Sequence, residues 1–328
     1  MKNKSTLAIV LSTSAIILII CVCAIGKDSA DLSVRNDARR NMPQQQIFSP
    51  AIPDTMSFAG EEVPLDQYYV RESLDREMIV NTFGHTNTLL YFKRAHRYFP
   101  VIEPILKKNG VPADFKYLCV IESGLTNATS PAKAQGFWQL IKATGQKYGL
   151  EINEEIDMRN NLEAATEAAC KFLKVLYNNL GSWTAAAAAY NCGEAGLSKN
   201  LNKQSIASYY DTRLNNETSR YVYRILAVKQ IMQHPQQYGF YLRPCDLYPI
   251  IPTRTAKLSG QNVDLYNFAK QNNTSYKVFR ELNPWITTEK LSNKANKSYT
   301  VKLPVNDGTS LRKIRTERDK GTEYIERL

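Results

Sequence analysis

The stretch from Phe115 to Gly124 places one carboxylic acid at the end of an apolar helical pattern. Four side chains share one face at i, i+3, i+4 and i+7 spacing: Phe115, Leu118, Cys119 and Glu122. Burial disfavours a carboxylate, so we expect the pKa of Glu122 to lie above its usual range. A carboxyl group that keeps its proton near neutral pH can act as a general acid. Glu122 is therefore the candidate catalytic residue; the alternative is a solvated Glu at a helix end.

Helical patterns surround this stretch and would have to position it. The predicted helices cover residues 88–108, 162–180, 183–190 and 217–233. We expect Pro100 and Pro104 to divide the first of them into shorter helices. Strand signals are nearly absent, so residues 61–246 are predicted to form an all-helical domain.

A cluster of prolines at positions 244, 249 and 252 marks the end of this domain. The segments that follow are predicted as a strand, two helices and a strand, at residues 253–258, 263–271, 275–282 and 298–303. Residues 247–305 would thus form a small α+β unit, and the charged tail 306–328 would be solvated. The predicted fold class is mainly α with a small C-terminal α+β domain.

The N-terminus has the composition of an export segment. Lys2 and Lys4 precede an apolar run, which indicates a signal peptide or an uncleaved membrane anchor over residues 1–26. Residues 27–60 lack periodicity and are interpreted as a linker. Either interpretation predicts an exported protein of the periplasm or cell envelope, and the anchor would add membrane attachment.

Composition narrows the classes of partner. The 328 residues carry a formal charge of +11 and are 43% hydrophobic, which excludes a disordered chain and suits an anionic partner. Nucleic acid is disfavoured because no zinc-finger spacing or phosphate-binding glycine loop accompanies the charge. The six cysteines follow no metal-ligand pattern, and we expect no metal or other cofactor. Cys119 and Cys170 fit buried apolar positions, and a disulfide cannot be assigned.

Four motifs in order resemble the lysozyme-like catalytic domain of family 1 lytic transglycosylases. They are Glu122-Ser123-Gly124, Ser130-Pro131 followed by Gly136-Phe137-Trp138-Gln139, Ala189-Tyr190-Asn191-Cys192-Gly193-Glu194, and Glu217-Thr218-Ser219-Arg220-Tyr221-Val222. Each motif alone is weak, whereas the four in this order and spacing are specific. The resemblance covers residues 85–235. The loop between Glu122 and Ser130 is one residue shorter than in many relatives.

The C-terminal unit resembles a lysin motif (LysM), a peptidoglycan-binding module. The matching positions are Leu265, Phe268, Ala269, Val278, Leu282-Asn283-Pro284 and Val301-Leu303-Pro304. Gly260-Gln261 stands where Gly-Asp is usual, so we expect a low affinity for sugar. The alternative is a module that only braces the catalytic domain.

The resemblance implies cleavage of the β-1,4 bond between N-acetylmuramic acid and N-acetylglucosamine in peptidoglycan during cell-wall remodelling. Glu122 would protonate the bridging oxygen and then accept the proton of the muramic acid C6 hydroxyl, which closes a 1,6-anhydro ring. Ordinary glycosidases use two carboxylates. Two alternatives are a hydrolytic muramidase, for which no second carboxylate stands out, and a non-catalytic peptidoglycan-binding protein. Peptidoglycan strands are the expected partner, with no nucleic acid.

Supporting roles follow from the same resemblance. The substrate-binding candidates are Ser130, Gln139, Tyr190, Asn191 and Tyr221. Ser130 would bind the sugar acetamido group or orient Glu122, and the two tyrosines would direct their hydroxyls at the acid. Phe137 or Trp138 could stack on a sugar, although Trp138 fits a core position better. We interpret Glu194 and Glu217 as structural.

Overall fold

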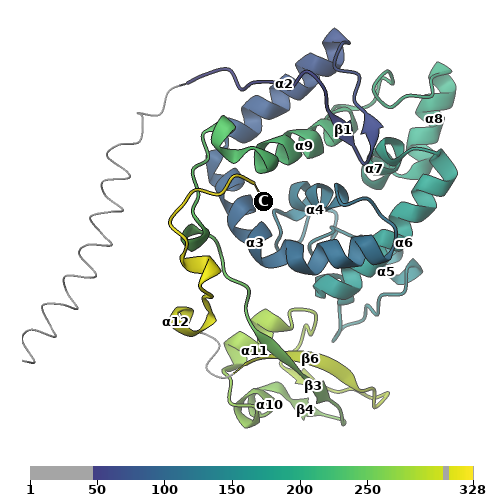
Figure 1. Ribbon diagram of the computed structural model, residues 1–328. Coiled ribbons are helices and arrows are strands. Elements are labelled where there is room, and N and C mark those ends of the chain that lie inside the picture. Colours follow the sequence, from purple (N-terminus) through teal and green to yellow (C-terminus); the bar gives the residue numbers. More distant parts are fainter. Residues whose placement is uncertain (1–46, 306–309, 328) are drawn as a thin grey trace, which may run out of the picture. The chain divides into compact units, whose positions relative to one another are not determined.

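The computed structural model describes residues 47–305 and 310–327 (Figure 1). Its main helices up to residue 233 are α2 (Tyr68–Phe83), α3 (His85–Lys108), α4 (Phe115–Ser123), α5 (Lys142–Lys147), α6 (Leu162–Leu180), α7 (Trp183–Cys192), α8 (Glu194–Gln204) and α9 (Asn216–Gln233). Two-residue strands, β1 (Ser57–Phe58) and β2 (Glu61–Glu62), precede them, and short 3-10 turns lie at Met158–Asn160, Pro235–Tyr238 and Pro244–Asp246. The predicted mainly helical architecture is confirmed.

Helix α4 lies at the centre of the helical part and packs against α3 and α9 (Figure 1). Five of its side chains are buried: Phe115, Tyr117, Leu118, Cys119 and Val120. Gly124 ends the helix in the left-handed conformation, with φ of +60°. A Cβ atom at this position would lie 3.2 Å from the Tyr91 ring, so the turn needs glycine both for its backbone and for space.

The division of the 88–108 helix by its prolines was predicted wrongly. Helix α3 runs unbroken from His85 to Lys108 with Pro100 and Pro104 inside it. Both prolines are exposed, so the carbonyls that lose their helical partners can bond to water. The opposite face of α3 is buried in the core, and this packing stabilises the helix through both prolines. The buried face consists of Thr88, Phe92, Ala95, Phe99, Ile102 and Leu106.

Helix α7 carries five consecutive alanines, all buried, and its N-terminus is held by a residue from the β1–β2 hairpin. The Glu61 carboxylate accepts hydrogen bonds from the Thr184 amide at 2.9 Å, the Thr184 hydroxyl at 2.6 Å and the Ser182 hydroxyl at 2.8 Å. A carboxylate at a helix N-terminus also interacts favourably with the helix dipole. The sequence suggested a helical pattern from Glu61 onward. Glu61 instead lies in the short strand β2 and binds the N-terminus of α7.

The C-terminal α+β unit has the predicted order of strand, helix, helix and strand. Its elements are β3 (Thr253–Leu258), β4 (Val263–Asp264), α10 (Leu265–Gln271), α11 (Tyr276–Leu282), β5 (Lys290–Leu291) and β6 (Tyr299–Pro304). Strands β3 and β6 pair antiparallel from Thr253 with Pro304 to Leu258 with Tyr299. A second buried cluster, distinct from the main core, lies in this unit and also includes Ile156 of the helical part. A core of this kind lets the unit fold regularly within so few residues.

The charged tail was expected to be solvated, and most side chains of its described part, residues 310–327, are exposed. A few contacts nevertheless attach this part to the rest of the protein. Ile314 in α12 (Leu311–Ile314) is buried, and the Arg315 guanidinium donates to the Cys245 carbonyl at 3.0 Å. Further along, the Ile325 amide donates to the Leu242 carbonyl at 2.8 Å. Scattered apolar residues therefore anchor a segment whose composition is mostly charged.

The predicted export segment lies outside the described residues, as does the linker up to residue 46. Within residues 47–305 and 310–327, no helix combines the length and the apolar character that crossing a membrane requires. The same residues contain no cluster of three or more His, Cys, Asp or Glu side chains suited to a metal ion. The cysteines of the described ranges are free thiols, and Cys119 and Cys170 are buried as predicted.

Candidate active site

Glu122 lies in the last turn of α4, with its carboxyl group directed into the space between α4 and α9. Burial raises the pKa of Glu122 to about 7, whereas a hydrogen bond from Tyr221 and the charge of Arg224 oppose this rise. The charge of Glu217 raises the pKa further. The predicted upward shift is therefore present, and its main cause is desolvation. A carboxyl group with this pKa can both donate and accept a proton near neutral pH.

Tyr221 of α9 is the closest polar partner of the acid. Its hydroxyl donates a hydrogen bond to Oε1 of Glu122. Burial, and then the neighbouring carboxyl group of Glu122, raise the pKa of Tyr221 well above its usual value, so the phenol remains a donor at every working pH. Arg224, one turn further along α9, stacks its guanidinium over the Tyr221 ring at 5.6 Å from the ring centre. The pair places one neutral donor and one cation beside Glu122.

Tyr190 of α7 differs from our expectation. Its hydroxyl donates to the Trp138 carbonyl at 2.6 Å and not to Glu122. The ring stands in an aromatic row, 5.2 Å from the ring of Phe172. The five alanines that precede Tyr190 pack α7 against α6, α8 and α9, and the loop that carries Trp138 supplies the partner of the phenol. Tyr190 therefore links α7 to that loop.

Asn191, the next residue of α7, faces α9. Its Oδ1 accepts a hydrogen bond from the Thr218 hydroxyl at 3.0 Å, and its Nδ2 lies 3.5 Å from Oε1 of Glu217. These contacts fix the amide orientation and give Glu217 a partner, in line with a structural role. Glu194 accepts a hydrogen bond from Asn179 at 3.0 Å, also at the surface.

Residues 125–140, which we call the active-site loop, connect α4 to α5. The loop is tied to α4 by Ser123, whose hydroxyl donates to the Phe137 carbonyl at 2.8 Å. Gln139 donates through Nε2 to the carbonyls of Ala128 and Gly136, both at 2.8 Å. Both amide hydrogens of Gln139 are thus used inside the loop, and only its carbonyl oxygen could accept a bond from a sugar.

The Ser130 hydroxyl has a partner inside the active-site loop. It accepts a hydrogen bond from the Ala134 amide at 3.0 Å and closes a tight turn of the active-site loop. Phe137 and Trp138, which were considered for stacking on a sugar, are both buried, with 4% and 0% of their surfaces exposed. The Trp138 indole donates to the Thr166 hydroxyl at 2.9 Å, which makes it a core residue as its size and position suggested.

The site therefore brings together Glu122 and Tyr221 in direct contact, with Tyr190 and Asn191 on the adjoining helix and Gln139 on the loop. Sequence reasoning missed Arg224. The sequence offered one indication of its role: Arg224 is a cation placed three residues after Tyr221, and its neighbours in the helix are apolar. Chemically, this arrangement offers one carboxyl group of near-neutral pKa, a phenolic donor and a cation that can stabilise the carboxylate form.

The sequence matches two family models that agree with this geometry. Residues 99–212 match the transglycosylase SLT domain, and residues 254–307 match the soluble lytic transglycosylase C-terminal LysM-like domain. The chain thus contains an SLT domain followed by a LysM-like domain, and the resemblance inferred from the four motifs is confirmed.

Among curated proteins, the chain is similar to membrane-bound lytic murein transglycosylase D of Escherichia coli strain K12. The identity is 31% over 202 residues, which are 59% of this chain and 44% of that protein. The protein of the same name from Escherichia coli O6:H1, strain CFT073, shows the same identity and coverage. The match spans under half the length of these relatives.

Proposed function

We propose that this chain is a peptidoglycan lytic transglycosylase and that Glu122 is its single catalytic acid and base. The observation that carries the proposal is the position of Glu122, half-buried at the end of α4, with a pKa of about 7 and a hydrogen bond from Tyr221. The SLT domain and the similarity to a murein transglycosylase support peptidoglycan as the substrate.

In the first step, protonated Glu122 donates its proton to the oxygen between N-acetylmuramic acid and N-acetylglucosamine. The bond from that oxygen to the muramic acid C1 breaks, and the acetamido oxygen of the same sugar supports the cationic carbon. In the second step, the Glu122 carboxylate takes the proton from the C6 hydroxyl, and the C6 oxygen bonds to C1. The products are a free N-acetylglucosamine hydroxyl and a 1,6-anhydro ring, with no water consumed.

Tyr221 and Arg224 suit the interval between the two steps, when Glu122 is a carboxylate. The Tyr221 hydroxyl donates to the carboxyl oxygen, and hydrogen bonds to a charged acceptor are stronger than those to a neutral one. The Arg224 cation, held over the Tyr221 ring, favours the same charged form. Both groups therefore lower the free energy of the intermediate state relative to the protonated resting state.

Product mass tests this proposal. Purified sacculi would be digested with the full chain, and the soluble products would be analysed by mass spectrometry. We expect anhydro-muramic acid ends. Reducing ends, heavier by one water, would instead identify a muramidase. The candidate for its second carboxylate would then be Glu217, whose charge acts on Glu122. Binding to sacculi without any released product would identify a non-catalytic binding protein.

We also propose that the LysM-like domain contributes to peptidoglycan binding and that the protein is exported to the periplasm or cell envelope. The first part rests on the LysM-like match, and the second on the basic and apolar N-terminal sequence. Co-sedimentation of the full chain with sacculi tests binding, and fractionation of cells that express it tests location. Recovery in the cytoplasmic fraction alone would contradict export.

A further inference from the structure

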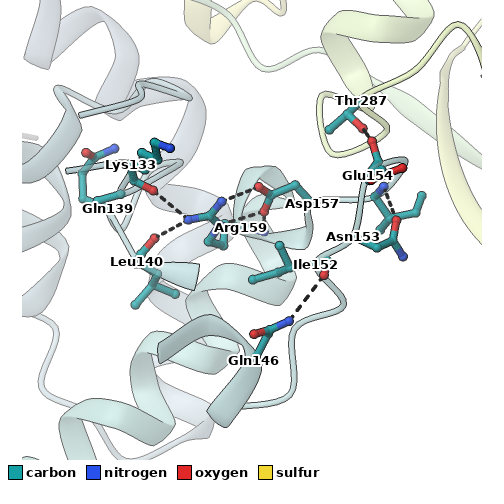
Figure 2. A network of polar contacts seen from close by, with 12 residues as sticks. Lys133, Gln139, Leu140, Gln146, Ile152, Asn153, Glu154, Asp157, Arg159 and Thr287 are labelled. Carbon is teal, nitrogen blue, oxygen red and sulfur yellow. Dashed lines mark hydrogen bonds and ion pairs between the residues drawn. The ribbon is translucent and has the colours of Figure 1, made fainter. Parts of the chain in front are cut away.

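The segment from Glu151 to Asp157, which we call the docking segment, joins the SLT domain to the LysM-like domain through main-chain contacts. The Asp157 amide donates to the Trp285 carbonyl at 2.8 Å, and the Thr287 amide donates to the Glu155 carbonyl at 2.8 Å. The Thr287 hydroxyl also donates to the Glu154 carbonyl, as Figure 2 shows. Paired backbone groups of this kind fix a register, which loose surface contacts would not do.

Side chains reinforce the same contact. The Glu155 carboxylate accepts hydrogen bonds from the Ser292 amide at 2.6 Å and the Asn293 amide at 3.3 Å. Ile156 has 1% of its surface exposed and belongs to the buried cluster of the LysM-like domain. Its backbone forms an isolated antiparallel β-bridge with Ile286. An apolar side chain of the SLT domain thus completes the core of the other domain.

The docking segment continues directly into a buried ion pair. Asp157 and Arg159 are each 6% exposed. The guanidinium of Arg159 binds the Asp157 carboxylate in a bidentate arrangement, with Nε to Oδ1 at 2.9 Å and Nη2 to Oδ2 at 2.6 Å. This geometry leaves Nη1 directed away from Asp157 and toward the active-site loop (Figure 2). Bidentate pairing fixes the guanidinium plane in a way that a lysine could not reproduce.

Arg159 holds both ends of the turn that carries Gln139. Its Nη1 donates to the Lys133 carbonyl at 2.9 Å and to the Leu140 carbonyl at 3.1 Å. Two residues of this turn, Lys133 and Gln139, have left-handed backbone conformations, with φ of +60° and +46°. Such conformations are unfavourable for residues with a Cβ atom and persist only where surrounding contacts enforce them.

Gly136 belongs to the same arrangement. A Cβ atom at this position would lie 2.0 Å from the Arg159 carbonyl oxygen, so the backbone of the loop approaches that of Arg159 as closely as glycine allows. The glycine of the Gly-Phe-Trp-Gln motif is therefore explained by Arg159. A cavity of about 740 Å³ is lined by Asn127 and Phe137 of the loop and by Trp285 of the LysM-like domain. The hydrogen bonds of the Asp157–Arg159 pair connect the docking segment to the active-site loop.

We infer that Asp157 and Arg159 are positioning residues for the active-site loop and that the docked LysM-like domain holds this pair in place. The LysM-like domain is then part of the catalytic scaffold in addition to any role in binding. The inference concerns loop geometry, and its effect on catalysis rests on the proposed function. Loss of docking should loosen the loop that presents Gln139 while leaving Glu122 and Tyr221 in contact.

Glu155→Ala tests the inference in the full chain, because it removes the two contacts to the Ser292 and Asn293 amides without touching a core residue. Glu154→Ala is the matched control, since it makes the same charge change at an exposed neighbour that uses only its carbonyl. Arg159→Lys is the second variant. It keeps the positive charge but cannot form the bidentate pair with Asp157. Hydrogen exchange of residues 130–140 and kcat and KM on short soluble glycans would be measured.

We expect Glu155→Ala and Arg159→Lys to speed hydrogen exchange across residues 130–140 and to lower kcat by about 3- to 10-fold, because small misplacements of positioning groups are costly. Glu154→Ala should match the wild type. Faster exchange confined to the LysM-like domain, with the active-site loop unchanged, would overturn the inference. The exchange measurement does not depend on activity, so it distinguishes this outcome from a failure of the proposed function.

Discussion

The Tyr221 hydroxyl donates a hydrogen bond to the Glu122 carboxyl group across 99 residues of sequence. The contact joins the last turn of α4 to the second turn of α9, and it makes the two helices a single unit in the site. The hydroxyl of Tyr190, by contrast, donates its hydrogen bond to the Trp138 carbonyl. Two tyrosines that the sequence suggested were equivalent therefore have different partners.

This difference predicts different effects of two matched substitutions. Tyr221→Phe removes the donor to Glu122, and we expect kcat/KM to fall by about 10- to 100-fold with little change in melting temperature. Tyr190→Phe removes the bond between α7 and the loop, and we expect a lower melting temperature with a smaller effect on rate. Assays on soluble glycans and thermal unfolding would measure both. Equal losses of activity in the two variants would show that the Trp138 bond matters as much as the acid's own partner.

Arg224 should shift the pH range of the reaction. A general acid acts in its protonated form, so kcat/KM should fall as the pH rises through the Glu122 pKa of about 7. The Arg224 charge favours the carboxylate, and Arg224→Gln should therefore raise this pKa and move the alkaline fall to higher pH. Arg224→Lys should restore much of the wild-type profile. The charged or titratable groups that act on Glu122 all come from α9 and are Tyr221, Arg224 and Glu217. Glu122 in turn raises the pKa of Cys119 on α4 and of Tyr190 on α7.

The control for this measurement is Arg213→Gln, which removes an exposed cation from the segment before α9. Its pH profile should match that of the wild type. If Arg224→Gln leaves the fall of kcat/KM at alkaline pH unchanged and alters only the melting temperature, Arg224 is a packing residue.

Glu61 should stabilise the protein in a pH-dependent way. Burial alone raises its pKa, but the hydrogen bonds from Thr184, Trp183 and Ser182 together hold it below the usual value of a glutamate. A lowered folded-state pKa contributes stability above the unfolded value of 4.5, and this contribution disappears as the pH falls through the folded value. We expect Glu61→Gln to lower the free energy of unfolding at pH 7 by about 1–3 kcal/mol.

Denaturant unfolding at pH 7 and at acidic pH would measure this effect. The difference between the wild type and Glu61→Gln should shrink as the pH falls below 4.5. Glu62→Gln is the control, because Glu62 is an exposed neighbour in the same strand. A difference that stays constant with pH would mean that Glu61 stabilises α7 by shape and not by charge.

The sequence was sufficient to predict the elements that depend on local patterns. The apolar period of residues 162–180 and the glycine after each of α4 and α6 give helix limits that the structure reproduces. The strand–helix–helix–strand order of the LysM-like domain was predicted for the same reason. Glu122 was found because one acid at the end of an apolar stripe is unusual in any helix.

Partners distant in sequence were not predictable in the same way. Nothing in the residues near Tyr190 indicates that the Trp138 carbonyl lies closer to its hydroxyl than the acid does. The continuity of α3 through Pro100 and Pro104 depends on which face is exposed, which is a tertiary property. Arg159 follows a short extended segment with no periodicity, and its bonds to Lys133 and Leu140 exist only once the active-site loop has folded.

Glu122→Gln tests the central claim most directly. The amide keeps the size of the side chain but cannot donate or accept the catalytic proton, and it is easier to bury than a carboxylate. Sacculi would be digested with the wild type and with the variant, the melting temperatures of both would be compared, and released muropeptides would be quantified by mass spectrometry. We predict a folded variant that releases anhydro-muropeptides at least about 1,000-fold more slowly. Release at close to the wild-type rate would contradict the assignment of Glu122 as the catalytic acid and base.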